Sequence, residues 1–329
     1  MGKDRMGTSE QAIFGGAPGA EPATPGSYGL PPQGFRLPSA TRLGPVRLQV
    51  ADLERSLAYY EEVLGLARLE REPARAMLGS LAADGLASVP LVELVERRGA
   101  RPATGRGRTG LFHFALLLPD RPALGRFVRH LGKIEARAGA GDHLVSEAFY
   151  LQDPDNLGIE VYADRPRSAW RRVGRELMMA TDPVDVAGLL AAGGEEAWRG
   201  MPAGTVMGHV HLHVGDLARA AAFYSEGLGF DRTVWEYPGA LFLGAGGYHH
   251  HVGTNIWAGA GASAPAADEA QLLEWTLELP DAASWAAVIE SLERGGHRRQ
   301  GAPTPTTSLA VVDPWGTRVR IEQGPNASA

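Results

Sequence analysis

The chain has 329 residues, a length that suits two domains, and 44% of them are hydrophobic, which is enough to form real cores. The net charge is −6 at pH 7, and no cluster of Lys and Arg suggests a nucleic-acid groove or a membrane-binding surface. The absence of Cys excludes disulfides, thiolate metal sites and Cys nucleophiles. Any metal must therefore be held by His, Asp and Glu, a ligand set that suits Fe(II), Mn(II), Zn(II) or Ni(II).

The first 40 residues are rich in Gly and Pro and show no periodicity, so we expect a disordered or draped N-terminal arm over residues 1–40. This end of the chain lacks the basic-then-apolar layout of a signal peptide, and no run of 18 apolar residues follows. We therefore expect a cytoplasmic protein that binds neither nucleic acid nor a membrane.

From residue 42 onward the sequence repeats itself. The stretch "DLERSLAYYEEVLGL" at 52–66 returns as "DLARAAAFYSEGLGF" at 216–230, with 8 of 15 positions identical. The dipeptide Asp-Pro at 153–154 returns at 313–314. The number of residues between the two copies of each motif is too large for the repeat of a solenoid and indicates domain duplication. We predict a first domain at 42–165, a linker at 166–204 and a second domain at 205–323.

Each predicted domain divides again into two similar modules. "VRLQV" at 46–50 is typical of a strand, and apolar residues at helical spacing follow between Leu53 and Leu64. Asp52 suits the start of that helix, and Gly65 suits its end. Extended segments come next, and the order then begins again at "FHFALLLP". The sequence predicts an α+β fold of four βαβββ modules in two domains.

These repeated features resemble the vicinal-oxygen-chelate superfamily of glyoxalases, fosfomycin-resistance proteins and extradiol dioxygenases. Each repeat has the strand, the "DL…Y…LG" helix and the Asp-Pro turn before a last strand, and the resemblance covers nearly all of residues 42–323. It implies paired βαβββ modules whose sheets curl into cups, with metal ligands on the first and last strands of the modules.

Residues 141–160 are similar to the signature of the extradiol ring-cleaving dioxygenases. That signature has Gly-x-His, an apolar residue before Tyr, then Asp-Pro-x-Gly shortly before Glu. Asn156 replaces the last Gly and tolerates positive φ better than most residues. The two-domain layout looks most like the bacterial catechol 2,3-dioxygenases. The matching residues are Gly141, His143, Phe149, Tyr150, Asp153, Pro154 and Glu160.

The resemblance implies a facial triad of two His and one carboxylate that holds Fe(II), with Mn(II) as the alternative. The family's ligand positions hold His113 and Glu160 in the second module and His209 in the third. Together these modules supply a complete triad, which implies a metal site that spans the two repeats. His211 lies two residues along the same strand and remains an alternative to His209.

The first and fourth modules lack such a set. Their corresponding positions hold Pro45, Glu274 and Arg320, and neither Pro nor Arg binds a metal. A rival site within the second repeat would combine His209, one of the histidines at 249–251, and Glu274 or Glu322.

Ring cleavage with O₂ needs a group that delivers a proton as the O–O bond breaks, and a pKa near neutrality favours His. The stretch "GYHHHVGTN" supplies three. If it forms a strand, His249 and His251 share a face, and the resemblance implies the acid–base role for His249 first and His251 second. The resemblance also implies that Tyr150 hydrogen-bonds a substrate oxygen and that His143 contacts the substrate.

The resemblance as a whole implies an Fe(II)-dependent extradiol dioxygenase that opens a catechol-type ring with O₂ to a muconic semialdehyde. Edge-rich modules of this kind are also compatible with a homo-oligomer. Two alternatives stay open at this point. One is a glyoxalase-like metal-dependent isomerase or transferase, which needs no O₂. The other is a non-catalytic ligand-binding protein of the bleomycin-resistance kind, which needs no metal.

Overall fold

Four βαβββ modules follow one another in the structure, a computed structural model that describes residues 19–82, 88–297, 299–300 and 308–324. The first consists of β2 (Arg42–Val50), α2 (Leu53–Glu62), β3 (Ala67–Glu72), β4 (Arg75–Gly79) and β5 (Pro90–Glu96). The second consists of β6 (Gly110–Leu117), α3 (Arg121–Lys133), β7 (Gly139–Asp142), β8 (Ser146–Gln152) and β9 (Gly158–Asp164).

The second repeat has the same order of elements. Its first module consists of β12 (Val206–His213), α5 (Leu217–Ala220), a π-helical continuation η2 (Ala221–Gly227), β13 (Asp231–Val234), β14 (Ala240–Gly244) and β15 (Val252–Asn255). Its second consists of β16 (Gln271–Leu279), α6 (Ala282–Arg294), β17 (Arg299–Gln300), β18 (Ser308–Val312) and β19 (Arg318–Gln323). The predicted α+β fold is confirmed. Among the helices of the described residues, none is both long and apolar enough to cross a membrane.

Every module helix begins after an Asp, which explains why the sequence repeats that residue. The Asp52 carboxylate accepts the Arg55 backbone N–H at 3.0 Å, as predicted for a helix N-cap. Asp120, Asp216 and Asp281 each make the same bond three residues ahead, at 2.7 Å. A cap of this kind satisfies a backbone donor that the helix leaves open, so four local signals fix four helix starts.

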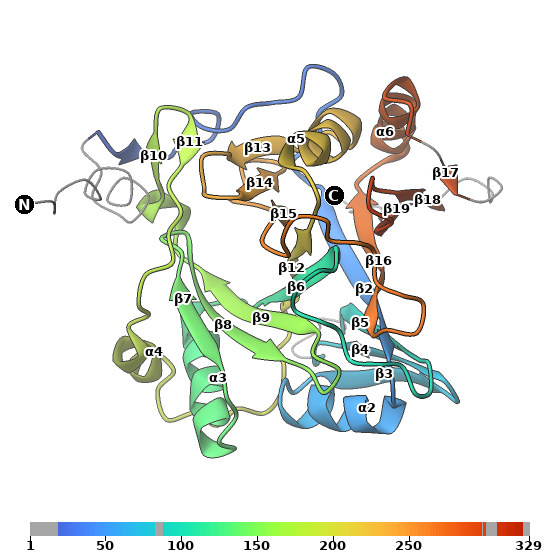
Figure 1. Ribbon diagram of the computed structural model, residues 1–329. Coiled ribbons are helices and arrows are strands. Elements are labelled where there is room, and N and C mark those ends of the chain that lie inside the picture. The colour runs from blue at the N-terminus through green and yellow to red at the C-terminus, as the bar shows by residue number, and fades with distance from the viewer. Residues whose placement is uncertain (1–18, 83–87, 298, 301–307, 325–329) are drawn as a thin grey trace, which may run out of the picture.

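The pairing of first strands decides which modules form a cup together. β12 pairs antiparallel with β6, which joins the third module to the second. β2 pairs antiparallel with β16, which joins the first module to the fourth. One bridge, Met207 to Leu43, connects these two halves into a sixteen-stranded sheet. Figure 1 shows this sheet between α2 and α3 at one end and α5 and α6 at the other.

The repeated Asp-Pro turns have a structural role. Asp153 accepts the backbone N–H groups of Asp155 and Leu157 at 2.9 and 2.8 Å, and the Tyr60 hydroxyl donates to it from α2. In the second repeat Asp313 makes the equivalent bonds, including one of 2.8 Å from the Tyr224 hydroxyl. Each turn therefore ties the last strand of one module to the helix of another.

The described part of the N-terminal arm packs against the second repeat. Strand β1 (Glu21–Pro22) pairs with β10 (Arg171–Val173), and the buried Tyr28 donates its hydroxyl to the Gly247 carbonyl. Arg36 makes two hydrogen bonds to Asp231, at 2.7 and 2.5 Å. A few anchors thus hold residues 19–40 against the rest of the chain, although this segment has no periodicity. Residues 1–18 lie outside the described residues.

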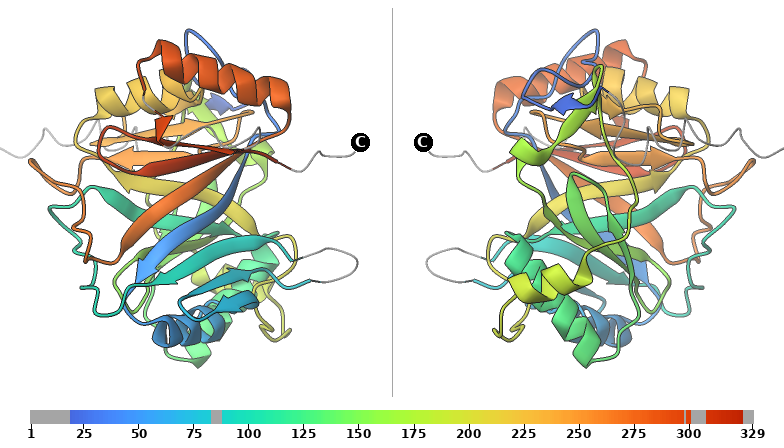
Figure 2. Two further views of the ribbon diagram at one scale, coloured as in Figure 1. Left: turned by 90° about the vertical axis from the view of Figure 1, so that its right-hand side faces the viewer. Right: turned by 90° about the vertical axis from the view of Figure 1, so that its left-hand side faces the viewer.

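The segment between the repeats is also structured. After β10 it forms β11 (Glu176–Leu177) and then α4 (Val186–Ala192), which packs against α3. In the right-hand view of Figure 2 it descends in yellow-green from the β10–β11 hairpin to α4. Between these two points lie Met178, Met179 and Ala180, all buried. The segment thus runs along the cup formed by the second and third modules.

Candidate metal centre

Three donor side chains meet on adjacent strands of the sheet. His113 lies on β6, Glu160 on β9 and His209 on β12, and β6 is the strand between the other two. Ala115 is in register with both Glu160 and His209, and His113 lies two residues earlier on the same face of β6. The structure therefore brings together the donors from both repeats that the sequence analysis combined.

The separations of the donor atoms suit a metal ion. His113 Nε2 is 3.0 Å from Glu160 Oε2, and His209 Nε2 is 3.2 Å from the same oxygen. The two Nε2 atoms are 3.3 Å apart. Donors on one face of an octahedron, with metal–ligand bonds of about 2.1 Å, are separated by roughly 3.0 Å. Two imidazoles and one carboxylate in this arrangement fit a divalent ion such as Fe(II) or Mn(II).

The electrostatics of these residues also favour a cation. Burial lowers the pKa of His113 and of His209, and Glu160 offsets this only in part, so both imidazoles are neutral at pH 7. Burial alone would raise the pKa of Glu160, but the two imidazoles together bring it well below its ordinary value. Imidazole lone pairs and a carboxylate that converge on one point repel one another unless a cation or a proton lies between them.

Tyr150 and His143 lie beside the triad. Tyr150 is in register with Glu160 across β8 and β9, so the turn between them preserves the register. The Tyr150 hydroxyl donates to His143 Nε2, and His143 Nδ1 donates to the Ala180 carbonyl at 2.6 Å. Asn156 has φ of 64°, as expected for the turn that precedes Glu160. Burial and the nearby Glu160 raise the pKa of Tyr150 well above 10, so its hydroxyl stays protonated.

The histidine run at 249–251 differs from our expectation. It does not form a strand, because Gly246 and Gly247 have φ of 59° and 68° and β15 begins only at Val252. The expected alternation of side chains therefore fails. His250 lines the same cavity as the triad, and its ring lies 4.2 Å from that of His209.

Neither of the two histidines that we favoured reaches that cavity. His249 is fully buried behind His250 and hydrogen-bonds Asp164 at 3.0 Å. His251 lines a different cavity, and its Nδ1 accepts the Ala245 N–H at 3.1 Å. His250 is therefore the histidine of this run that sequence reasoning missed, and only the run itself gave a signal for it.

Comparison with known proteins agrees with this architecture. The family described as "Glyoxalase/Bleomycin resistance protein/Dioxygenase superfamily" matches residues 42–161 and 206–321. The chain belongs to this superfamily. It is 44% identical over 278 residues to the catechol-2,3-dioxygenase of Bacillus subtilis (strain 168), which covers 83% of this chain and 94% of that protein.

Solved structures of the superfamily share the fold at low sequence identity. Glyoxalase I from Zea mays matches with a TM-score of 0.51 and 19% identity, over 86% of this chain and 92% of that one. A protein of Bacillus subtilis subsp. subtilis str. 168, provisionally named a dioxygenase, matches with a TM-score of 0.59 and 13% identity, over 88% of this chain and 87% of that one. Identities this low show the fold alone.

His211 does not join the triad, although it follows His209 on β12. It is in register with His113, and its Nε2 accepts from Asn255 Nδ2 at 2.9 Å. Asn255 also hydrogen-bonds His213, at 2.6 Å. The Asn255 side chain thus holds both imidazoles away from Glu160. Among the described residues, the group of at least three metal-binding side chains is the one already given.

The second superfamily cup, between the first and fourth modules, has lost the donor set. Glu274 occupies the position of His113 but accepts from Arg320 Nε at 2.5 Å, and Arg318 lies 3.6 Å away. Arg320 in turn occupies the position of Glu160, and it also lies 3.5 Å from Glu322. The rival site that uses Glu274 or Glu322 with His209 is therefore wrong, because both carboxylates pair with arginine in the other cup.

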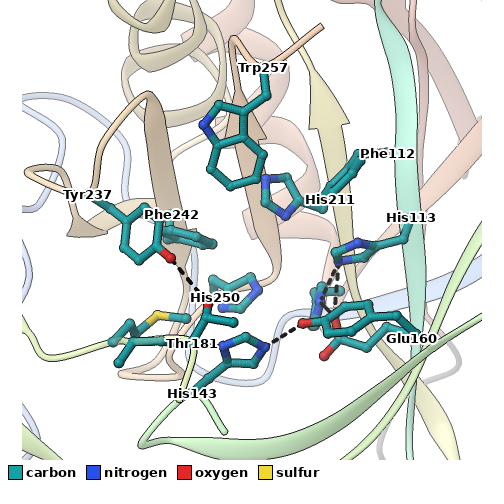
Figure 3. A pocket seen from close by; sticks show the side chains of 14 residues that line it. Phe112, His113, His143, Glu160, Thr181, His211, Tyr237, Phe242, His250 and Trp257 are labelled. Carbon is teal, nitrogen blue, oxygen red and sulfur yellow. Dashed lines mark hydrogen bonds and ion pairs between the residues drawn. The ribbon is translucent and has the colours of Figure 1, made fainter. Parts of the chain in front are cut away.

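The triad opens into a cavity of about 240 Å³ with largely aromatic walls (Figure 3). Phe112 and Trp257 stand at its edge, with 38% and 43% of their surfaces exposed. Phe112 reaches the side of His113 because a β-bulge interrupts the pairing of β6 with β12 there. No periodic pattern marks these positions in the sequence. The remaining lining residues are His143, Tyr150, Met179, Ala180, Thr181, His211, Tyr237, Phe242 and His250.

Proposed function

We propose that this chain is an Fe(II)-dependent extradiol dioxygenase, which opens a catechol-type ring with O₂ to a muconic semialdehyde. The observation that carries the proposal is the convergence of two imidazoles and one carboxylate at 3.0 to 3.3 Å on the wall of a mostly aromatic cavity. The 44% identity to a protein named catechol-2,3-dioxygenase supports the choice of reaction and substrate class.

His113, His209 and Glu160 would hold the metal, Fe(II) or alternatively Mn(II). When bound, such an ion supplies the redox chemistry toward O₂, and three protein ligands leave further coordination positions open. The two imidazoles come from different repeats, so the binding site depends on the pairing of β6 with β12. All three donors are buried, which would limit the competition of water for their ligand atoms.

Tyr150 would orient the substrate. Its hydroxyl hydrogen points to His143, so its oxygen lone pairs remain for a substrate O–H. His143 is itself fixed by the Ala180 carbonyl, and it lines the cavity where it can contact the ring. The segment between the repeats would therefore help to orient the Tyr150 hydroxyl toward the substrate, because its Ala180 carbonyl holds His143.

His250, in place of His249 and His251, would supply the imidazole that takes a proton from the substrate and returns it as the O–O bond breaks. It faces the cavity from the wall beside His209. Burial and the surrounding imidazoles lower the pKa of His250 well below its ordinary value, which favours the neutral ring. A neutral imidazole in this position has a nitrogen that can accept.

The test is to load the purified chain anaerobically with Fe(II), or with Mn(II) in parallel, and then add catechol and air. The expected result is O₂ uptake together with the yellow ring-opened product. Tight metal binding without O₂ uptake on any of several catechols would refute the dioxygenase and favour the glyoxalase-like isomerase or transferase. Ligand binding that is indifferent to metal would instead favour a bleomycin-resistance-type binding protein.

A further inference from the structure

A chain of hydrogen bonds leads from the metal cavity to the protein surface. It starts at His250, whose Nδ1 lies 2.7 Å from the Nδ1 of His249. It continues from His249 Nε2 to Asp164 Oδ1, over 3.0 Å. The His249 side chain is fully buried, whereas 28% of the Asp164 side chain is exposed. The chain therefore runs from the cavity through a buried imidazole to a carboxylate that solvent reaches.

Strand β9 runs from the proposed metal centre to the surface end of this hydrogen-bond chain. Glu160, Tyr162 and Asp164 alternate along β9 and so share one face, with Glu160 at the metal centre and Asp164 at the last residue of the strand. The Tyr162 hydroxyl lies 2.6 Å from the Tyr248 hydroxyl, which donates to Asp164 Oδ1 at 3.3 Å. Strand β9 and the hydrogen bond from Tyr248 thus hold Asp164 in place beside His249.

The donors and acceptors along the chain can be assigned in order. An ionised carboxylate only accepts, so the proton in the contact with Asp164 lies on His249 Nε2. If His249 carries a single N–H, its Nδ1 has a free lone pair and accepts. The proton between the two rings therefore belongs to His250 Nδ1. A neutral His250 then has no proton on Nε2.

With the protons placed in this way, His250 Nε2 is a hydrogen-bond acceptor that faces the cavity. Within the part of the chain that the structure describes, His250 Nε2 has no hydrogen-bond partner, and it is not among the enclosed side-chain atoms that lack one. Its ring lines the cavity between Phe242 and His209, at 4.9 and 4.2 Å between ring centroids (Figure 3). The nitrogen left without a proton is thus the one available to a molecule in the cavity.

We infer that Asp164 is a positioning residue, which acts through His249 to fix the tautomer of His250 so that Nε2 accepts a hydrogen bond from a substrate hydroxyl. This inference rests on the proposed function for the identity of the ligand, but the tautomer itself does not. The alternative arrangement, in which both nitrogens of His249 carry protons, would reverse the central bond and present an N–H to the cavity.

Long-range ¹H–¹⁵N NMR spectra of histidine-labelled protein report which ring nitrogen carries the proton. They are recorded on the metal-free chain and on the chain loaded with diamagnetic Zn(II), and His249→Gln and His250→Gln variants assign the signals. We expect Nε2–H for His249 and Nδ1–H for His250. Nε2–H on His250, or protons on both nitrogens of His249, overturns the inference from the unmutated protein alone.

Asp164→Ala and Tyr248→Phe form a matched pair of variants. The first removes the acceptor of His249, and the second removes the other hydrogen bond to that carboxylate together with the Tyr248–Tyr162 hydrogen bond. We expect Asp164→Ala to lower the Nδ1–H fraction of His250, whereas Tyr248→Phe preserves it. An unchanged tautomer in Asp164→Ala contradicts the inference, as does an equal change in both variants.

Activity gives a second readout. Loss of an outer-shell hydrogen-bond partner in a metal site typically costs 10–100-fold in activity, and Asp164→Ala, which acts on His250 through His249, should lower kcat/KM for catechol by up to about that factor. Tyr248→Phe should change it less than about 3-fold. Absence of O₂ uptake in the unmutated protein refutes the proposed function but leaves the NMR result intact. Full activity in Asp164→Ala refutes the inference while the proposed function stands.

Discussion

Replacing His209 with Ala tests whether the metal site spans the two repeats, because His209 is the donor from the second repeat. His209 Nε2 is 3.2 Å from Glu160 and 3.3 Å from His113, and no other described side chain completes a set of three donors. The variant leaves one imidazole and one carboxylate. Fe(II) binding should therefore weaken strongly, although two donors remain.

The size of the loss can be bounded from the geometry. Removing a residue that only hydrogen-bonds a metal ligand typically costs 10–100-fold in metal affinity, so removing a direct ligand should cost at least ~100-fold, or about 2.8 kcal/mol. Folding should suffer less. His209 Nδ1 is a buried atom without a hydrogen-bond partner, and the space vacated opens into the existing cavity. The metal-free variant should therefore stay folded.

His211→Ala is the matched control, because His211 is a buried imidazole on the same strand and lines the same cavity. Its loss leaves Asn255 Nδ2 without the partner that it has at 2.9 Å, which typically costs about 1–3 kcal/mol of stability. We therefore expect opposite profiles. His209→Ala loses metal and keeps stability, whereas His211→Ala loses stability and keeps metal affinity within about 3-fold.

The assay is anaerobic Fe(II) titration against a chromophoric chelator, with urea unfolding of the metal-free proteins alongside. One Fe(II) per chain in the unmutated protein and a dissociation constant at least ~100-fold higher in His209→Ala is the expected outcome. If His209→Ala retains iron and His211→Ala loses it, the reasoning fails and the ligand is His211. If both retain iron, the site lies elsewhere.

Three further predictions concern single residues. Burial raises the pKa of Asp153 from 3.8 to about 6, so its charge destabilises the fold increasingly as the pH rises between these two values. The free energy of unfolding of Asp153→Asn should therefore gain up to ~3 kcal/mol relative to the unmutated chain between pH 4 and 7. A difference in urea unfolding that does not depend on pH would contradict this. Arg320→Ala should lower the free energy of unfolding by about 1–2 kcal/mol, because it leaves the buried Glu274 without its partner at 2.5 Å, whereas Arg320 itself is 39% exposed. Replacing both residues with Met should recover most of this loss. If the double variant recovers nothing, the loss has another cause. Tyr150→Phe should lower kcat/KM for catechol by up to ~10-fold with metal content unchanged, and loss of metal in this variant would show that Tyr150 supports the ligands instead.

The repeated architecture could be predicted because its signals are local. Each Asp that caps a module helix and each apolar residue at helical spacing acts within one or two turns, and duplication shows every signal more than once. The convergence of His113, Glu160 and His209 was also expected, since strand parity and the family's ligand positions put these donors on first and last strands. Pairing across the repeats was favoured because only the second and third modules place two His and one carboxylate at the family's ligand positions.

The errors have a common physical origin in backbone that departs from a regular strand. Two glycines with positive φ turn the chain before His249, so parity assigned His249 and His251 to a cavity that His250 reaches. A β-bulge on β6 likewise lets Phe112 line the cavity beside His113, an arrangement that strand alternation alone does not give. Residues 19–40 and 176–182 have no periodicity because they follow the surface of other elements, and their positions depend on long-range packing that no local pattern encodes.

The two cups suggest why the proposed metal centre would need only one of them. In one cup, neutral imidazoles and a buried carboxylate converge, and a cation from solution would complete their electrostatics. In the other cup, Arg320 places a guanidinium against Glu274 and supplies that cation from the chain itself. The same strand positions thus either offer ligands to an ion or form an ion pair within the chain. Since β2 and β16 pair antiparallel along this second cup, we expect this half of the sheet to stay paired whether or not a metal ion is bound in the other cup.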